Sequence, residues 1–255
     1  MRYDIDEEAG KLTVSDGGST TTVDLWSPEG FSKLAPLWVR AGWQAKYMYT
    51  FSWFGRPVIQ LPEDLITLQE QIWETKPTVI IETGVAHGGS LVFHAGVLQA
   101  LGCGRVIGID IEVRDHNRSA IEEHPLGSMI ELVIGSSTDP AIVAQVAGML
   151  SPDDRVMVIL DSNHTYAHVR DELAAYAPLV TSGQWLVATD GVMNTVHDVP
   201  RAGENWETDN PSRAAQEFAA ANSDFVLVDP VPPVFDESDG VTRPTHWPSA
   251  WLRRR

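Results

Sequence analysis

The sequence predicts an α/β fold with a doubly wound, mostly parallel sheet, and three observations support this class. From Pro62 onward, short apolar runs rich in β-branched residues alternate with helical stretches, which requires crossover helices between parallel strands. The first of these runs leads into a glycine-rich turn that opens a helix. Polar residues or a glycine stand at the ends of five runs, which finish at Thr83, Asp110, Gly135, Asp161 and Asp190. Because open α/β sheets bind ligands beyond the carboxyl ends of their strands, we expect a pocket there.

The alternating elements follow one another in regular order within a predicted central domain, residues 62–230. The predicted strands are 78–83, 105–110, 129–135, 155–161, 184–190 and 225–229. The predicted helices are 63–75, 90–101, 117–123, 140–150, 168–179 and 211–221. Each strand run is four to eight residues of mainly apolar character, as expected for a strand covered on both faces.

Residues 1–61 form a predicted N-terminal arm or lid. Strand-like runs at Lys11–Val14 and Thr20–Leu25 flank the turn-forming sequence SDGGS, which predicts a small hairpin. Residues 27–54 are helical in pattern and unusually rich in aromatic residues. These rings either bury the arm against the main domain or a second subunit, or form a lid over a small-molecule pocket. The Pro- and Asp-rich tail, residues 231–255, is predicted to be an arm or a disordered end.

Composition excludes several classes of function. The chain has 255 residues, with 18 Lys and Arg against 35 Asp and Glu and a net charge of −17, which argues against binding of nucleic acid. Its single cysteine, Cys103, excludes an internal disulfide framework and a thiolate zinc cluster. The N-terminus is acidic and no apolar run has the length that spans a bilayer, so we expect a cytoplasmic protein without a membrane association.

The sequence IIETGVAHGGS, residues 80–90, is the most informative segment. Gly84 and Gly88 permit a tight turn in which a ligand lies against bare backbone beside a helix N-terminus, although the same glycines would also serve close packing of helix and strand. Asp110 ends the next strand, where a carboxylate can accept hydrogen bonds from both hydroxyls of a ribose. Together these features predict a nucleotide-type cofactor.

The spacing of the turn favours S-adenosylmethionine. Dinucleotide folds prefer G-x-G-x-x-G, whereas three residues separate Gly84 from Gly88 here and Glu82 lies two residues before the first glycine. No lysine follows the turn, which excludes the Tyr-x-x-x-Lys pair of short-chain dehydrogenases. A phosphate-binding GxxxxGK[ST] loop and the ligand pattern of a non-haem iron oxygenase are also absent from the sequence.

Residues 49–190 resemble the cephalosporin hydroxylase/rhamnosyl O-methyltransferase family, a class I S-adenosylmethionine-dependent group with a Rossmann-like sheet. The matching stretches are SWFGRPVIQLPEDL, KPTVIIETGVAHGGS, RVIGIDIEVR, IELVIGSSTD, VILDSNHTYAHVRDEL and YAPLVTSGQWLVATDG. The resemblance implies methyl transfer to a hydroxyl, often on a sugar of a natural product such as an antibiotic, with a divalent metal beside the methyl donor.

The resemblance also implies positions for the cofactor. It places Glu82, Gly84 and Gly88, with Ser90 at the end of the same turn, around the amino-acid end of the cofactor. It places Asp110 on the ribose, as the residues themselves suggest. Ser136 and Ser137 would lie near the adenine, but these serines could equally cap the helix that begins at Pro140.

The segment LDSNHTYAHVRDEL supplies the predicted catalytic residues. Asp161 stands at a strand end, where a carboxylate needs a cation or hydrogen-bond donors, so we expect it to bind a metal or the cofactor amine. His164 could remove the proton from an acceptor hydroxyl or could be purely structural. His168 is predicted to lie on the helix surface.

Asp190 ends the fifth strand and is predicted to face Asp161, so that the pair could hold Mg²⁺. The family pattern has adjacent Glu and Asp at this strand end, whereas residue 189 is Thr189 in this chain. Either waters complete a weak magnesium site, or the metal is dispensable and His164 acts alone as base. His197 and Asp198, a few residues further on, are additional candidates.

Two functions are consistent with the sequence. The first is an O-methyltransferase that acts on a small polyhydroxylated acceptor, such as a rhamnose-like deoxysugar, free or on a glycosylated scaffold. The second is a non-catalytic cofactor-binding protein that assists another biosynthetic enzyme. The aromatic arm predicts a homo-oligomer in both cases.

Overall fold

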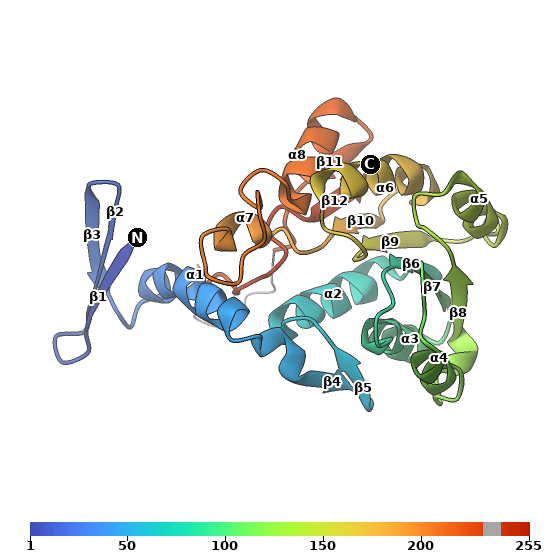
Figure 1. The fold of residues 1–255 in the computed structure, drawn as a ribbon, viewed down its shortest axis with the longest axis horizontal. Helices are drawn as coiled ribbons and strands as arrows, with labels where there is room; N and C mark the ends of the chain where they lie inside the picture. Colours follow the sequence, from blue (N-terminus) through green and yellow to red (C-terminus); the bar gives the residue numbers. More distant parts are fainter. Residues whose placement is uncertain (232–240) are drawn as a thin grey trace.

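The computed structural model describes residues 1–231 and 241–255, and its centre is a seven-stranded sheet between two layers of helices (Figure 1). The strands lie in the order β11-β12-β10-β9-β6-β7-β8. They are β6 (Val79–Thr83), β7 (Arg105–Asp110), β8 (Ile130–Ile134), β9 (Val156–Leu160), β10 (Trp185–Ala188), β11 (Phe225–Leu227) and β12 (Trp251–Arg254). The pairs from β10 to β8 are parallel, and β12 is antiparallel to both of its neighbours. The predicted doubly wound, mostly parallel sheet is therefore confirmed.

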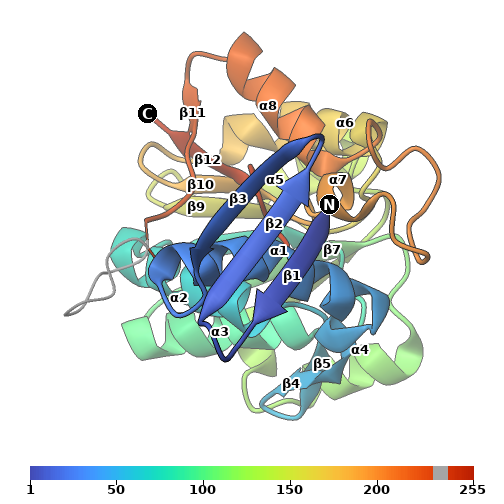
Figure 2. The same ribbon diagram turned by 90° about the vertical axis from the view of Figure 1, so that its left-hand side faces the viewer.

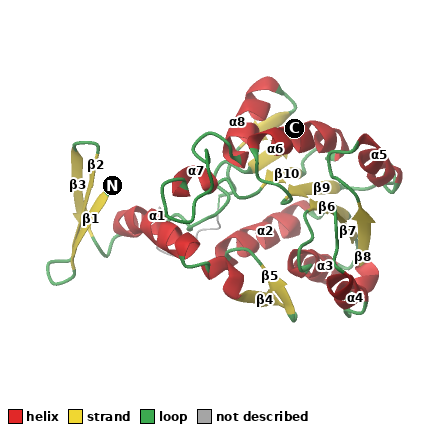
Figure 3. Cartoon of the chain, in the orientation of Figure 1, coloured by secondary structure: helices red, strands yellow, loops and turns green. Residues whose placement is uncertain are grey.

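Alternating side chains of the strands build two cores, one on each face of the sheet. On one face Ile80 packs with α2 (Pro62–Thr75), α3 (Gly89–Leu101) and α4 (Asp115–Glu122). On the other face Ile81 packs with α5 (Pro140–Gly148), α6 (Tyr166–Tyr176) and α8 (Pro211–Ala221). Neighbouring residues of a strand point to opposite faces, so strands of continuous apolar sequence are buried on both sides. Figure 3 shows the strands between the two groups of helices.

Helix starts follow local signals in the sequence. Proline occupies the first turn of α2, α5 and α8, where its missing N–H costs nothing. The side chains of Asp139 and Asn210 cap α5 and α8 by accepting hydrogen bonds from backbone amides. These signals explain why the predicted helices begin within a few residues of the observed ones.

The N-terminal arm stands away from the main sheet. Strands β1 (Arg2–Asp6), β2 (Lys11–Asp16) and β3 (Ser19–Asp24) form a separate antiparallel sheet, so the predicted hairpin is present with one additional strand. This sheet projects from the body at the end of α1 (Pro28–Gln44), and Figure 2 views the molecule from its side. Trp43 and Met48 are buried against Val192 and Val196 near α7 (Met193–Val196). The C-terminal end of α1 is thereby fixed to the segment that follows β10.

The predicted disordered end is wrong for the last residues of the chain. Residues 251–254 form β12, which lies inside the main sheet between β10 and β11. Trp251 and Leu252 are buried, Arg253 and Arg254 are partly exposed in the strand, and Arg255 is exposed beyond its end. Residues 232–240 of the predicted tail lie outside the described residues.

Short elements complete the described chain. The turn η1 (Tyr47–Thr50) leads into the antiparallel pair β4 (Phe51–Trp53) and β5 (Arg56–Val58), which contacts α3. The turns η2 (Gly127–Met129) and η3 (Ala177–Leu179) precede β8 and follow α6. No helix in the described ranges combines the length and the apolar character needed to cross a membrane.

Candidate functional site

A cavity of about 490 Å³ lies at the carboxyl ends of the parallel strands. It lies beside β6 and β9. From β6 the chain proceeds to β7 and β8 on one side and then continues with β9 on the other side of β6. Open α/β sheets bind ligands at such a change of direction in the strand order. Residues after β6, β7, β8, β9 and β10 line it, together with Tyr49 and residues 57–60. Of the predicted site residues, the lining includes Gly84, Ser90, Asp110, Ser136, Ser137, Asp161, His164 and Asp190.

The glycine-rich turn is built for close approach of backbone to backbone. Gly84 has φ +90°, and a Cβ at this position would lie 2.0 Å from the carbonyl oxygen of Asp161. A Cβ at Gly89 would lie 2.1 Å from the carbonyl oxygen of Pro57. Gly88 also has a positive φ and precedes α3, but it is buried against Ile121 and does not line the cavity. The turn therefore brings Gly89 and Ser90, the first residues of α3, to the cavity wall.

Glu82 lies behind this turn. Its side chain is fully buried, and its two carboxylate oxygens contact the Ser90 hydroxyl and His94 Nε2. Glu82 is outside the cavity lining, whereas Ser90 belongs to it. We therefore interpret Glu82 as a support for the Ser90 side chain, and its place around the amino-acid end of a cofactor stays a prediction.

Asp110 connects the ends of β6 and β7. Its Oδ2 accepts hydrogen bonds from the amides of Val85 (2.8 Å) and Ala86 (3.3 Å), and its Oδ1 accepts one from the amide of Glu112 (3.2 Å). The carboxylate is partly exposed in the cavity wall and retains lone pairs for a further donor. This geometry is suitable for the predicted contact with ribose hydroxyls.

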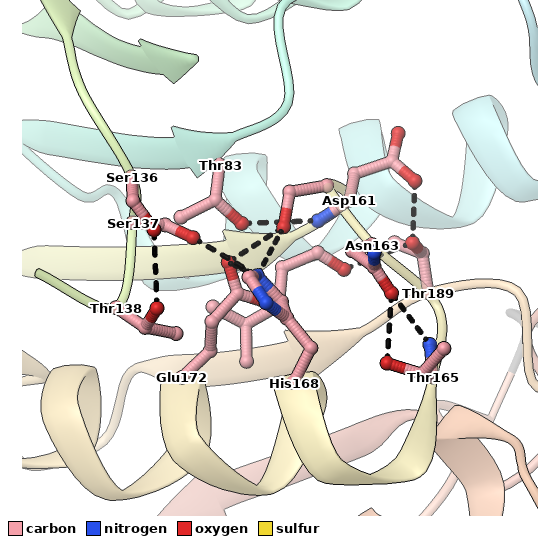
Figure 4. Close-up of polar contacts among 12 residues, drawn as sticks. Thr83, Ser136, Ser137, Thr138, Asp161, Asn163, Thr165, His168, Glu172 and Thr189 are labelled. Carbon is pink, nitrogen blue, oxygen red and sulfur yellow. Dashed lines mark hydrogen bonds and ion pairs between the residues drawn. The ribbon is translucent and has the colours of Figure 1, made fainter. Parts of the chain in front are cut away.

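Ser137 belongs to a hydrogen-bonded cluster centred on His168 (Figure 4). His168 Nε2 lies 3.1 Å from Ser137 Oγ, 3.1 Å from Ser162 Oγ and 3.4 Å from Glu172 Oε1. The hydrogen bond with buried Glu172 raises the pKa of His168 above its usual value. His168 lines the cavity, so its predicted place on the helix surface is wrong: α6 begins at Tyr166 and turns this residue toward the sheet.

The second predicted serine bonds locally. Ser136 Oγ lies 3.1 Å from Thr138 Oγ1, also drawn in Figure 4. The capping residue of α5 is Asp139, so the alternative in which Ser136 or Ser137 caps this helix is wrong. Neither serine caps α5, and both belong to the cavity wall.

Asp161 is held by two neutral side chains. Its Oδ1 accepts a hydrogen bond from Thr189 Oγ1 (2.5 Å), visible in Figure 4, and its Oδ2 accepts one from Gln60 Nε2 (3.2 Å). Removal from water raises the pKa of Asp161 well above its usual value, and the charges of Asp190 and Glu82 raise it further. Gln60 is a site residue that sequence reasoning missed, since it precedes α2 and meets Asp161 only through tertiary structure.

His164 and Asp190 complete the reacting centre. His164 Nε2 lies 3.5 Å from Asp190 Oδ2, and both side chains are partly exposed to the cavity. Asp190 has φ +56°, a conformation that costs a non-glycine residue about 1–3 kcal/mol and that often marks functional positions. The outlying candidates lie outside the cavity lining, because Asp198 pairs with Arg40 and His197 is exposed.

Asp161, His164 and Asp190 could together hold a metal ion. One potential ligand atom from each lies within 4.8 Å of the other two. Two carboxylate oxygens and one imidazole nitrogen fit a divalent cation whose remaining ligands are water. Thr189 is fully buried and directs its hydroxyl to Asp161, so this position adds no negative charge to the site.

A family model described as rhamnosyl O-methyltransferase/CmcI matches residues 45–255. The chain belongs to this family. The match covers the sheet, the glycine-rich turn, all residues of the cavity wall and the C-terminal strand. The family resemblance noted in the motifs is therefore confirmed.

Named relatives of the chain are mycobacterial. A rhamnosyl O-methyltransferase of Mycobacterium leprae is 31% identical over 156 residues, which is 60% of this chain and 66% of the relative. The rhamnosyl O-methyltransferase of Mycobacterium tuberculosis is 32% identical over 133 residues, 51% of this chain and 53% of the relative. The matches thus span between about half and two thirds of the length of these relatives.

Solved structures share the fold. A structure of CmcI with Mg and SAM has a TM-score of 0.54 at 18% identity and covers 81% of this chain and 77% of that chain. An O-methyltransferase from Bacillus cereus in complex with SAH has a TM-score of 0.50 at 15% identity and covers 78% of this chain and 90% of that chain. The fold of this family member is therefore the Rossmann-like fold of S-adenosylmethionine-dependent methyltransferases.

Proposed function

We propose that this chain is an S-adenosylmethionine-dependent O-methyltransferase that methylates a hydroxyl of a small polyhydroxylated acceptor, with a rhamnose-like deoxysugar as the favoured class. The observation that carries the proposal is the position of Asp161, His164 and Asp190 in one cavity with the glycine-rich turn and Asp110. A methyl donor and an acceptor hydroxyl need this combination of a nucleoside site and a proton-accepting site. The names of the mycobacterial relatives support the sugar acceptor.

In this proposal the two ends of the donor would contact different residues of the cavity wall. Asp110 would accept hydrogen bonds from the ribose, and Ser136 and Ser137 would face the adenine. The amino-acid end would lie between the turn at Gly84 and Ser90 and the carboxylate of Asp161. His164 lies in the same cavity wall, where it could accept the proton of an acceptor hydroxyl.

In the proposed reaction, the acceptor oxygen attacks the methyl carbon of the sulfonium while the carbon–sulfur bond breaks and its electron pair stays on sulfur. His164 accepts the hydroxyl proton, and Asp190 stabilises the imidazolium that forms, because its carboxylate already lies 3.5 Å from Nε2. Asp161 connects two parts of the cavity wall, because it accepts hydrogen bonds from Thr189 and Gln60. Alignment of the two reactants contributes much of the rate.

In the alternative to His164 acting alone, a divalent cation held by Asp161 and Asp190 would make the acceptor hydroxyl more acidic. The missing carboxylate at Thr189 predicts a weak site that waters complete, since affinity for hard cations depends on ligand charge. Calorimetric titration with Mg²⁺ in the presence of S-adenosylhomocysteine tests this point without reference to activity.

Substitution of His164 tests the proposed base. His164→Ala should lower kcat by a factor of about 10²–10⁴, the usual contribution of a positioned general base, and leave the affinity for S-adenosylhomocysteine nearly unchanged. His197→Ala removes an exposed histidine outside the cavity and is the matched control. Unchanged turnover in His164→Ala would remove this residue from the mechanism. Cofactor binding by the wild type without methyl transfer to any hydroxylated acceptor would instead favour a non-catalytic assembly role.

The proposal includes a homo-oligomer. Trp26, Phe31 and Trp38 on the arm are exposed, and large exposed apolar side chains in one region are typical of subunit contacts. The arm sheet also extends away from the body of the molecule (Figure 1), where a second copy could cover it.

A further inference from the structure

Tyr49, from the turn η1, is part of the cavity wall. In the part of the chain that the structure describes, it is the one Phe, Tyr or Trp residue of the cavity lining, and 55% of its surface is exposed. Tyr49 belongs to η1, and the residues that line the cavity beside it are 57–60, which include Gln60. Tyr49 differs from the other exposed aromatic residues by lying in the cavity wall, where its ring leaves apolar surface that a ligand can cover.

Arg201 fixes the region around this ring. Its backbone amide donates a hydrogen bond to Gln44 Oε1 (2.9 Å), and its Nη1 donates one to the carbonyl oxygen of Trp43 (2.8 Å). Its guanidinium carbon lies 5.4 Å from the ring centroid of Trp43 and 5.5 Å from that of Tyr49, within the range of cation–π attraction. Three segments, α1, η1 and the chain after α7, thus converge on the Tyr49 ring.

We propose that Tyr49 is the binding platform for the sugar ring of the acceptor, with Arg201 as the residue that positions it. The inference rests on the proposed methyltransferase function and adds the acceptor subsite to it. One face of a pyranose presents mainly C–H groups, and burial of this apolar face on a flat ring is favourable. The hydroxyl groups at the edge of the sugar would meet the polar lining formed by Gln60, Asn163 and His164.

The polar lining favours a pyranose over a planar phenol. Gln60 Oε1 is buried and has no partner among the described residues, whereas Gln60 Nε2 already donates to Asp161 and Asn163 Oδ1 already accepts from Thr165. A planar phenol stacked on Tyr49 carries its hydroxyl donors at one edge, and a buried acceptor left without a donor is costly. A polyhydroxylated ring carries donors around its whole edge and can supply one to Gln60 Oε1. The contact of the sugar ring with Tyr49 and the hydrogen bonds of the sugar hydroxyls would together determine which hydroxyl lies beside His164.

Saturation-transfer difference NMR tests the platform directly. The probe is methyl α-L-rhamnopyranoside, added to protein saturated with S-adenosylhomocysteine, with catechol as the planar competitor. Wild type and Tyr49→Phe should transfer saturation to the C–H protons of the pyranoside, whereas Tyr49→Ala should weaken binding by about tenfold, as loss of an aromatic contact of about 1.4 kcal/mol predicts. Tyr47→Ala, in the same turn but outside the lining, is the control.

The role of Arg201 is separable from that of Tyr49. Arg201→Lys keeps the charge and loses the planar guanidinium, so it should weaken pyranoside binding less than Tyr49→Ala and raise the KM for acceptor without lowering kcat. A structural role alone would lower both kcat and thermal stability and leave the KM for acceptor unchanged.

Titration of every variant with S-adenosylhomocysteine keeps the two proposals distinguishable. Loss of S-adenosylhomocysteine binding in the wild type would overturn the proposed function itself. If the cofactor product binds normally, the platform is overturned by any of three results: no pyranoside binding to the wild type, equal binding to Tyr49→Ala, or preferential binding of catechol.

Discussion

Individual site residues could be predicted from the sequence where they stand at the end of a strand. Asp110 is the last residue of β7, Asp161 and Asp190 come just after β9 and β10, and parallel strands bring their carboxyl ends to one edge of the sheet. The structure places all three in the cavity wall. Gln60 and Tyr49 were not predictable as site residues, because they precede the first strand of the main sheet and reach the cavity only through tertiary packing.

His168 provides a residue-scale prediction on the pH dependence of stability. Its pKa is raised in the folded protein, chiefly by the hydrogen bond with Glu172, so the charged form stabilises the fold. This contribution is fully present below the unfolded pKa of about 6.5 and is lost as the pH rises through the higher folded value. His168→Gln should therefore lower the free energy of unfolding by about 2 kcal/mol at pH 6 and by less at pH 9.

Urea unfolding of wild type and His168→Gln at both pH values measures this difference. His116→Gln, at an exposed position of α4, is the control for the loss of an imidazole without a buried partner. A destabilisation of equal size at pH 6 and pH 9 would show that charge on His168 does not stabilise the fold.

Among the elements, strands β6 to β10 and their crossover helices could be predicted from the sequence, because apolar runs and helical stretches alternate there. Strand β12 could not be predicted, because it is a four-residue strand that follows a Pro- and Asp-rich stretch and ends in arginines. Its insertion depends on pairing with β10 and β11, which lie far away in sequence. Local pattern carries no information on such a partner.

Strand β12 should contribute strongly to stability. Trp251 is buried beside Trp185 and Trp247, with ring centroids 5.5 and 6.0 Å away. Trp251→Ala should lower the free energy of unfolding by about 3–5 kcal/mol, since it leaves a large cavity. Urea denaturation measures the loss, and Trp73→Ala, at an exposed position of α2, is the control. Similar values for the two variants would mean that β12 is not an integral strand of the sheet.

At the scale of the whole molecule, the N-terminal arm contacts the segment that carries Asp190 and is also the proposed contact with a second copy of the chain. Its C-terminal end packs on the segment after β10, which carries Asp190, while its sheet extends from the body. Sedimentation equilibrium should give a mass that is a multiple of 28.0 kDa, and a variant that starts at residue 27 should shift toward the monomer. A monomeric full chain at micromolar concentration would contradict the proposed homo-oligomer.

The cavity at the carboxyl ends of the sheet is the proposed binding site of the methyl donor. Calorimetric titration of the full chain with S-adenosylhomocysteine measures this binding, with Asp110→Ala as the comparison. We expect saturable binding at one site per chain and an affinity at least about tenfold lower in Asp110→Ala, which loses a charge-assisted hydrogen bond. If the wild type does not bind S-adenosylhomocysteine, with or without Mg²⁺, the cavity is not a site for the methyl donor.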